Sequence, residues 1–374
     1  MSKFEIKSLG ADSRHKGRIS KGCMQCAKGR KMVLFITGKC NFHCFYCPIS
    51  EKRGNKDNIY ANERPITDDN RGISEMLEEA KLINALGTGI TGGDPIKVLP
   101  RTVKYIKILK KEFGSKHHIH LYTATPVNEK QIKLLDDAGL DELRLHILPE
   151  FWNNFERSKY RDSILALQKS NILPAVEIPL MPDKKKELKN LIFSLDEIGL
   201  PFINLNELEI SETNVSGLEE CGYVCGKNSL VGVEGSRKVG MEMLKLPVKI
   251  GINVCTSTYK DSVQLRNRLL ERAKNVARNF EIITGDGTIL RGIIETQNPE
   301  ETAETLEKDF GLKKEEYSIN LGKQRIELVP ELAEEIAEKT NLKCFIVENY
   351  PTYDEVEVER IPLGKYKTED NCFQ

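Results

Sequence analysis

The chain has 374 residues, of which 39% are hydrophobic and 30% are charged, and its 56 basic residues equal its 56 acidic residues. This size and composition predict a globular protein with one large domain and a smaller one, or two medium ones. Zero net charge excludes a chain-wide field for nucleic acid or an anionic membrane, so such binding would need a local patch. Because neither a membrane-spanning apolar run nor an apolar signal segment is present, we expect a cytoplasmic protein with no membrane partner.

Residues 1–31 are predicted to be an N-terminal lead-in, and the first 22 of them an exposed basic segment. This lead-in contains the pair Cys23-x2-Cys26. Two thiolates at this spacing can bind one metal ion or two corners of an iron–sulfur cluster. The pair therefore supplies half of a metal site. In a chain without a secretion signal, cysteines point to metal or redox chemistry rather than to disulfides.

Three further cysteines lie in the segment GKCNFHCFYCPIS, directly after an apolar run at 32–37. Cys40, Cys44 and Cys47 have the spacing Cys-x3-Cys-x2-Cys, and three thiols this close cannot all pair as disulfides. On one short loop they can hold three irons of a cubane cluster, which normally has four cysteine ligands. The missing ligand suggests that a small molecule completes the site. A structural zinc knuckle is the alternative.

Short apolar runs alternate with helical periodicity from residue 32 to about residue 210. This alternation predicts a parallel sheet with helices outside it, in an α/β fold of the partial (β/α)6 TIM-barrel type. A doubly wound sheet is the alternative. The predicted strands are 32–37, 89–91, 118–123, 142–147, 175–180 and 202–206. The predicted helices lie at about 70–86, 100–113, 128–138 and 183–198, with Asn128 and Asp183 as N-caps and Gly139 and Gly199 as stops.

Polar residues alternate with apolar ones along the later strands, as in 118–123, where Ile119 and Leu121 share one face. If the apolar faces meet the helices, the polar faces point into the barrel, where buried polar groups need partners. A polar ligand would supply such partners, and pairing among the residues themselves is the alternative. The inward set comprises His118, His120, Tyr122, Arg144, His146, Glu177, Asn204 and Asn206.

A glycine-rich segment, Thr91-Gly92-Gly93-Asp94-Pro95, ends the second predicted strand. Glycines have no Cβ, so the backbone can approach a ligand closely and its carbonyls can accept hydrogen bonds from an ammonium group. The segment is therefore predicted to be a binding shelf.

The cysteine loop and this shelf, in this order on successive strands, resemble the motifs of the radical S-adenosylmethionine (SAM) superfamily. The resemblance implies a [4Fe–4S] cluster on Cys40, Cys44 and Cys47, with SAM bound to its fourth iron. It also implies reductive cleavage of SAM to a 5′-deoxyadenosyl radical, with an electron donor such as a ferredoxin or flavodoxin. The shelf resembles a Gly-Gly-Glu-Pro motif that binds the methionyl amino group, with Asp94 in place of Glu. The cofactor-binding residues so implied are Tyr46, Gly92, Gly93, Asp94, Pro95, Arg144 and His146, with Glu177, Asn204 and Asn206 as weaker candidates for SAM or substrate.

More narrowly, the chain resembles archaeal proteins related to pyruvate formate-lyase activating enzyme. The residues that carry this resemblance are Cys23-x2-Cys26, Thr37-Gly38-x-Cys40, 88–95, 118–123, and Cys255 followed by Tyr259-Lys260-Asp261 and Gln264-Leu265-Arg266. The resemblance to that group covers most of the chain. The resemblance to the activating enzymes themselves is confined to about 32–210, the predicted radical SAM core, and implies no particular substrate.

Residues 211–278 are predicted to be a metal-ligand and linker region, and 279–374 a small α+β extension with a frayed tail at 368–374. Cys221-x3-Cys225 could be ligands or two cysteines on one helical turn. A strand at 248–255 ends on Cys255. Together, Cys23, Cys26 and Cys255, with Cys221 or Cys225, predict a second site for an iron–sulfur cluster or zinc. A basic helix at 259–278 could contact RNA phosphates, although such a face is more often solvated.

Three functions follow as hypotheses. The first is a radical SAM enzyme that modifies a macromolecule, either a protein side chain or tRNA. The second is an activating enzyme that installs a glycyl radical in a partner protein. The third is a non-catalytic iron–sulfur or zinc binding module, which would form no 5′-deoxyadenosine from SAM.

Overall fold

The structure is a computed structural model that describes residues 4–227, 229 and 231–365. The chain forms two compact units, Met1–Leu265 and Arg266–Gln374. The expected frayed tail at 368–374, with Cys372, lies outside the described residues.

Unit 1 is built on an eleven-stranded sheet in the order β1-β2-β11-β10-β9-β8-β7-β6-β3-β4-β5. The parallel strands are β3 (Lys31–Phe35), β6 (Gly87–Thr91), β7 (His118–Thr123), β8 (Glu142–Leu145), β9 (Leu173–Leu180), β10 (Phe202–Glu207) and β11 (Gly251–Cys255). The antiparallel edges are β1 (Ile6–Gly10), β2 (Ser13–Lys16), β4 (Ile59–Ala61) and β5 (Arg64–Ile66). The predicted α/β fold is confirmed, and β11 extends the six predicted parallel strands by one.

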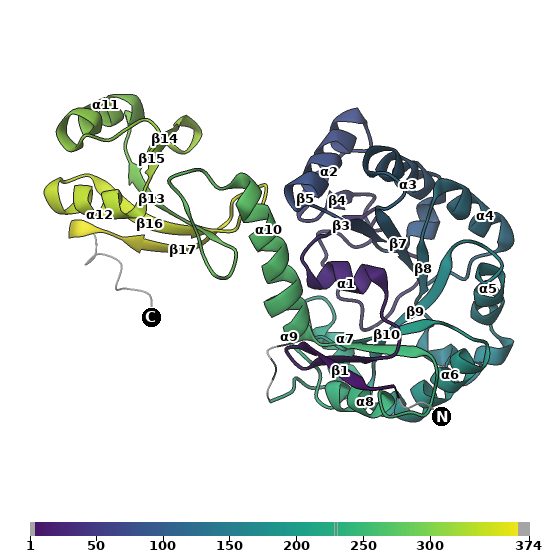
Figure 1. Ribbon diagram of the computed structural model, residues 1–374. Helices are drawn as coiled ribbons and strands as arrows, with labels where there is room; N and C mark the ends of the chain where they lie inside the picture. Colours follow the sequence, from purple (N-terminus) through teal and green to yellow (C-terminus); the bar gives the residue numbers. More distant parts are fainter. Residues whose placement is uncertain (1–3, 228, 230, 366–374) are drawn as a thin grey trace. The chain divides into compact units, whose positions relative to one another are not determined.

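Helices lie around the outside of this curved sheet (Figure 1). They are α2 (Asn70–Leu82), α3 (Leu99–Phe113), α4 (Glu129–Ala138), α5 (Lys159–Leu167), α6 (Lys185–Glu197) and α8 (Ser236–Met243). The short α7 (Val215–Glu220) packs instead on the loop that follows β3. The apolar strand faces, with Leu121, Leu143 and Ile178, are buried with these helices in one core. Asn128 caps α4 and Gly139 ends it, as predicted. Asp183 does not cap α6, because Pro182–Lys184 forms a 3₁₀ turn and Lys184 is the N-cap.

The segment from Ser13 onward is an integral part of unit 1, so the prediction of an exposed segment is wrong there, whereas β1 is largely exposed. Strands β1 and β2 form a hairpin, and β2 pairs antiparallel with β11. Ser13 is fully buried and its hydroxyl lies 3.0 Å from the Thr256 hydroxyl. The hairpin was hard to foresee because its strands are polar and its pairing partner lies far along the chain.

Helix α1 (Lys21–Ala27) follows the hairpin and lies within the curve of the sheet (Figure 1). A Cβ added to Gly22 would stand 2.6 Å from His120 Nδ1 and 2.9 Å from Lys31 Nζ, so α1 packs directly on the inner face. Gln25 Nε2 donates to the Leu86 carbonyl at 3.0 Å. The Cys23-x2-Cys26 pair, which α1 carries, is thereby held against the inside of the sheet.

The segment after β11 begins with α9 (Ser257–Tyr259) and a π-helical turn, Lys260–Leu265. Helix α10 (Arg266–Val276) starts unit 2, so the predicted single helix at 259–278 is a π-helical turn followed by an α-helix. Unit 2 has a six-stranded antiparallel sheet with α11 (Pro299–Phe310) and α12 (Pro330–Lys339). Its strands are β12 (Ile282–Ile283), β13 (Ile289–Glu295), β14 (Tyr317–Asn320), β15 (Arg325–Leu328), β16 (Lys343–Asn349) and β17 (Glu357–Pro362). Strands β12 and β13 pair antiparallel.

We expect Ser13→Ala to lower the free energy of unfolding by about 1–3 kcal/mol, because it leaves the buried amide of Thr256 without its acceptor. The exposed Ser8→Ala, on the same hairpin, should change it by less than about 0.5 kcal/mol. Chemical denaturation of both variants measures the difference, and equal stability would show that the hairpin does not secure β11.

Candidate active site

The cluster loop, residues 38–50, leaves β3 at the carboxyl end of the parallel sheet. Its base is closed by two backbone hydrogen bonds, from Gly38 N to Lys56 O at 2.8 Å and from Asn55 N to Gly38 O at 2.9 Å. Cys40, Cys44 and Cys47 are all half-buried free thiols on this loop. The Phe42 amide donates to Cys40 Sγ at 3.4 Å, and the Cys47 amide donates to the Cys44 carbonyl. The loop thus presents three thiols with backbone amides beside them.

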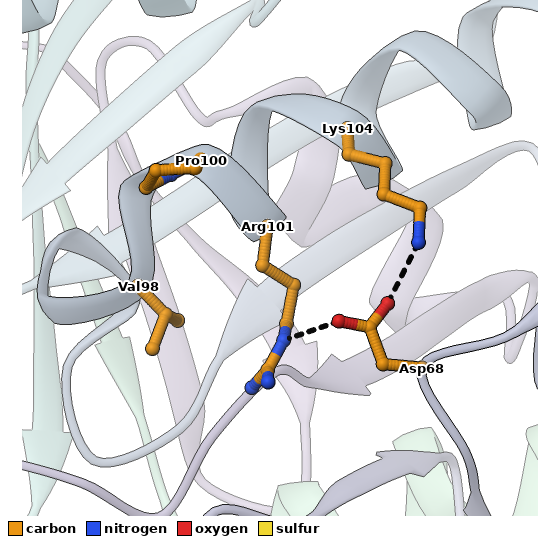
Figure 2. A pocket seen from close by; sticks show the side chains of 5 residues that line it. All are labelled: Asp68, Val98, Pro100, Arg101 and Lys104. Carbon is orange, nitrogen blue, oxygen red and sulfur yellow. Dashed lines mark hydrogen bonds and ion pairs between the residues drawn. The ribbon is translucent and has the colours of Figure 1, made fainter.

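An ion-pair network braces the start of this loop from outside. The Asp57 carboxylate accepts from the Thr37 hydroxyl at 3.1 Å and pairs with Arg101 at 2.6 Å. Arg101 also pairs with Asp68, which Lys104 contacts at 2.8 Å, beside a surface pocket of about 400 Å³ (Figure 2). Hydrogen bonds from Arg101 and Lys39 hold the pKa of Asp57 well below its usual range. The carboxylate therefore stays charged and joins α3 to the end of β3.

The glycine shelf, residues 92–95, touches the cluster loop directly. The Gly93 amide donates to Thr37 O at 2.7 Å, and the Asp94 amide donates to Lys39 O at 2.8 Å. A Cβ on Gly93 would stand 2.4 Å from Lys39 O and 2.5 Å from Gly38 O. These glycines therefore allow the backbone of the shelf to approach the cluster loop of the same chain closely.

The carboxylate of Asp94 is fully buried and is used within the chain. One oxygen accepts from the Thr123 hydroxyl at 2.6 Å and from the Ile96 amide at 2.9 Å. The other accepts from the amide and hydroxyl of Thr125 at 3.0 and 2.7 Å. With four donors satisfied, the side chain fixes the shelf to β7, and only backbone groups of the shelf are left to meet a ligand.

Tyr46, His146 and Tyr122 form a buried line beside the cluster loop. The Tyr46 hydroxyl lies 2.8 Å from His146 Nε2, and the Tyr122 hydroxyl lies 2.7 Å from His146 Nδ1. Burial lowers the pKa of His146 to about 4, so the imidazole is neutral at pH 7. The ring is therefore held by two hydroxyls as an uncharged group at the end of β8.

Arg144, which the sequence proposes as a ligand for a carboxylate, binds two carboxylates of the chain. Its Nε donates to Glu142 at 2.6 Å and its Nη1 to Glu177 at 2.5 Å, while Nη2 lies 2.9 Å from the Ser20 hydroxyl. Although burial opposes the effect, Arg144 holds the pKa of both glutamates below the usual value. All three groups stay charged inside the sheet.

A row of amides continues from this ion pair across the inner face. Asn206 donates to Glu177 at 2.9 Å, Asn204 to Asn206 at 3.1 Å, and Asn253 to Asn204 at 2.6 Å. On the other side, His120 contacts Lys31 at 2.6 Å. The inward polar residues thus pair largely with one another. Asn253 and Lys31 were missed from the sequence, although Asn253 alternates with Ile252 and Val254 in the manner used for the other strands.

Cys221 and Cys225 are exposed and lie in a segment that packs on the cluster loop. Asn214 Nδ2 donates to the Tyr46 carbonyl at 3.1 Å, and the rings of Tyr223 and Phe45 stack with their centroids 6.2 Å apart. These contacts tie the segment that carries Cys221 and Cys225 to the cluster loop. Neither cysteine gains support from them as a ligand of a second site.

The cluster loop fits an iron–sulfur cluster by its donor set. Cys40, Cys44 and Cys47 are free, half-buried thiols on one loop whose base is closed by the hydrogen bonds of Gly38. Among the described residues, no three His, Cys, Asp or Glu side chains converge on a point where one ion would sit. A cluster does not require such convergence, because each thiolate binds a different iron.

Comparison with known proteins assigns the family. Residues 34–164 match the Radical SAM superfamily. A candidate glycyl-radical enzyme activating enzyme of Methanocaldococcus jannaschii is 44% identical over 359 residues, which cover 92% of this chain and 93% of that protein. The chain belongs to the radical SAM superfamily. It is therefore an enzyme that uses a [4Fe–4S] cluster and SAM.

Other matches are narrower. A candidate GTP 3′,8-cyclase of Methanococcus aeolicus is 31% identical over 160 residues, or 41% of this chain and 48% of that protein. The solved structure of native anSMEcpe with bound AdoMet and Kp18Cys peptide covers 69% of this chain and 72% of its own, with 14% identity and a TM-score of 0.41. Residues 287–363 match a domain of unknown function (DUF8061). No helix in the described part of this radical SAM protein is long and apolar enough to cross a membrane.

We expect Gly93→Ala to weaken SAM binding on the order of tenfold or more, because its Cβ would push the shelf away from the cluster loop. The matched control is Gly54→Ala, whose Cβ would meet its nearest atom at an ordinary 3.4 Å. Equilibrium dialysis of the reconstituted proteins against labelled SAM compares the two. Equal affinities would contradict the proposed shelf.

We expect Arg144→Gln to lower the free energy of unfolding by about 3–5 kcal/mol, since two buried carboxylates would lose their counter-charge. Arg161→Gln, which breaks a surface pair with Glu156, should cost less than about 1 kcal/mol. Denaturation in urea measures both. A stable Arg144→Gln variant that only loses SAM affinity would instead make Arg144 a cofactor ligand.

Proposed function

We propose that this radical SAM enzyme acts on a protein and abstracts a hydrogen atom from a glycine of that partner, as a glycyl-radical activating enzyme does. The observation that carries the proposal is the relative named for this activity, because its 44% identity extends over 92% of the chain and so includes unit 2. If the relative resembled only the sheet of unit 1, the resemblance would support the use of SAM and a cluster but not a particular substrate.

The proposed reaction balances in electrons and atoms. A cluster held by Cys40, Cys44 and Cys47 would pass one electron from a ferredoxin or flavodoxin to SAM, whose C5′–S bond would break to give methionine and a 5′-deoxyadenosyl radical. Transfer of one hydrogen atom from a glycine α-carbon then gives 5′-deoxyadenosine and a glycyl radical on the partner. No further oxidant is needed.

The chain's own residues would hold and shield the reactants. Cys40, Cys44 and Cys47 would bind three irons, and the backbone of residues 92–95 would accept hydrogen bonds from the methionyl ammonium. Asp94 keeps that backbone against the loop through its bonds to Thr123 and Thr125. Tyr46 and the neutral His146 would border the SAM site without adding charge. Because Arg144, Glu177 and Asn206 are already paired with one another, the protein does not need water to satisfy these three side chains.

The alternative of an RNA substrate loses its main support. That alternative was suggested by the basic helix at 259–278, but several of its basic side chains form ion pairs within the chain. Arg278 pairs with Glu281 and Glu327, Lys274 with Glu271, and Arg272 donates to the Pro351 carbonyl. Charges neutralised in this way add little to phosphate binding. The family assignment likewise opposes the hypothesis of a non-catalytic module.

The test follows deuterium into 5′-deoxyadenosine. The reconstituted full chain, with dithionite and SAM, is incubated anaerobically with protein and RNA fractions from cells grown on glycine deuterated at the α-carbon. We expect deuterium transfer from the protein fraction, with a glycyl radical signal by electron paramagnetic resonance (EPR). Transfer from the RNA fraction, or from neither, would overturn the proposal.

Two variants make that test specific. Cys44→Ala should abolish 5′-deoxyadenosine formation, because the cluster would lose a ligand. Cys344→Ala removes a buried thiol in the core of unit 2 and should leave formation within about twofold of the parent. Equal activity in the two variants would remove the cluster loop from the reaction.

A further inference from the structure

A second cavity lies on the inner side of unit 1, between α1 and the strands β2 and β11. Its volume is about 310 Å³, and its walls include Cys23 from α1, His15 from β2, Asn253 from β11, and Tyr259 and Gln264. Asn253 also donates to Asn204, which places the cavity beside the polar row described above. The functions assigned to the cluster loop and the shelf do not use this cavity.

Strand register brings a third cysteine to the same place. His15 and Asn253 are direct partners across the antiparallel β2–β11 pair, so their side chains share a face. Cys255 follows Asn253 by two residues on the same strand and points to that face as well. Gln264, a wall of the cavity, donates to Cys255 Sγ at 3.6 Å. Cys255 is therefore linked to the cavity through Gln264, although its own side chain is not one of the walls.

The thiols of α1 complete the group. Cys26 follows Cys23 by three residues and so lies on the same side of the helix. Helix α1 packs against the π-helical turn that carries Gln264, and Gln264 contacts Cys255 Sγ. The turn therefore brings Cys255 to the helix that carries Cys23 and Cys26. No disulfide joins them, and all are free.

Two polar atoms at the cavity lack partners. His15 Nδ1 and Asn253 Oδ1 are buried without a hydrogen bond, and Asn253 is only 3% exposed. An unpaired buried polar group costs about 1–3 kcal/mol. An iron bound to His15 Nδ1 would recover that cost at the imidazole, whereas Asn253 Oδ1 accepts only and would need a donor such as a water molecule. The turn that carries Gln264 is π-helical, a rare geometry that occurs frequently at functional sites. These features indicate a bound group rather than a packing defect.

The size and spacing favour a cluster over a single ion. A structural zinc site is a closed tetrahedron of four ligands around one ion. Here the ligating side chains do not converge on one point, among the residues that the structure describes. The cavity, at about 310 Å³, has about ten times the volume of one liquid water, far more than one ion needs. The cysteines of the cluster loop share this lack of convergence.

We propose that Cys23, Cys26 and Cys255 bind a second iron–sulfur cluster in this cavity, with His15 as the fourth ligand. The proposal rests on unit 1 alone and is independent of whether the substrate is a protein. Cys221 and Cys225, which pack with the segment over the cluster loop, are not part of the set.

The test separates the two clusters by variants of the full chain after anaerobic reconstitution with iron and sulfide. The variant Cys40→Ala/Cys44→Ala/Cys47→Ala should retain roughly a third to a half of the parent's iron, for a two-iron or four-iron cluster beside a four-iron one. It should also retain matching sulfide and an EPR signal, after reduction, that SAM does not perturb. Loss of all iron, or zinc in its place, would overturn the proposal.

The reciprocal variant Cys23→Ala/Cys26→Ala/Cys255→Ala should keep only a signal that SAM perturbs, which also shows that it has folded. The matched control Cys221→Ala/Cys225→Ala should keep all the iron. If the parent fails to form 5′-deoxyadenosine while the first variant still holds iron, the proposed function fails and the second site stands. His15→Ala should shift the spectrum of the second cluster, and an unchanged spectrum would remove His15 from the ligand set.

Discussion

The charge of Arg144 is the constraint on which the inner face depends. A guanidinium enclosed by a parallel sheet must be neutralised where it lies, and Glu142 and Glu177 do so from its own strand and the next. Ser20 joins the same group from the cap of α1. The strands, the N-terminal helix and the amide row are therefore linked to one another through the buried ion pairs of Arg144.

This arrangement leaves the SAM site at the carboxyl edge of the sheet. There the cluster loop, the shelf and the line from Tyr46 to Tyr122 meet. Each is fixed from behind, the loop by Asp57 and Arg101 and the shelf by Asp94. The groups that would meet the cofactor are mainly thiols and backbone carbonyls, because the acidic side chain of the shelf is turned into the protein. A shorter acid than Glu suits that internal role.

Much of this could be read from the sequence where a pattern is local. Alternation along β7 to β10 predicted which residues face inward, and the cysteine spacing predicted the cluster loop. Contacts between residues that lie far apart in the sequence could not be predicted. The sequence around Asp94 does not indicate that its carboxylate binds Thr125. Likewise, the polar sequence of β2 does not indicate that this strand pairs with β11. Arg144 is intermediate, since Glu142 lies two residues away on the same face, but the alternation says only that both point inward.

The pairing of β2 with β11 also sets an order of events during synthesis. Ser13 and Thr256 are separated by 243 residues, so their contact cannot form until nearly all of unit 1 has left the ribosome. The cluster loop and the shelf have by then been made and can already have come together. Helix α1 is held separately, by Ser20 on Glu142 and by Gln25 on the Leu86 carbonyl, and both partners are made before β11. Of the three cysteines proposed for the second cluster, Cys255 is the last to be made.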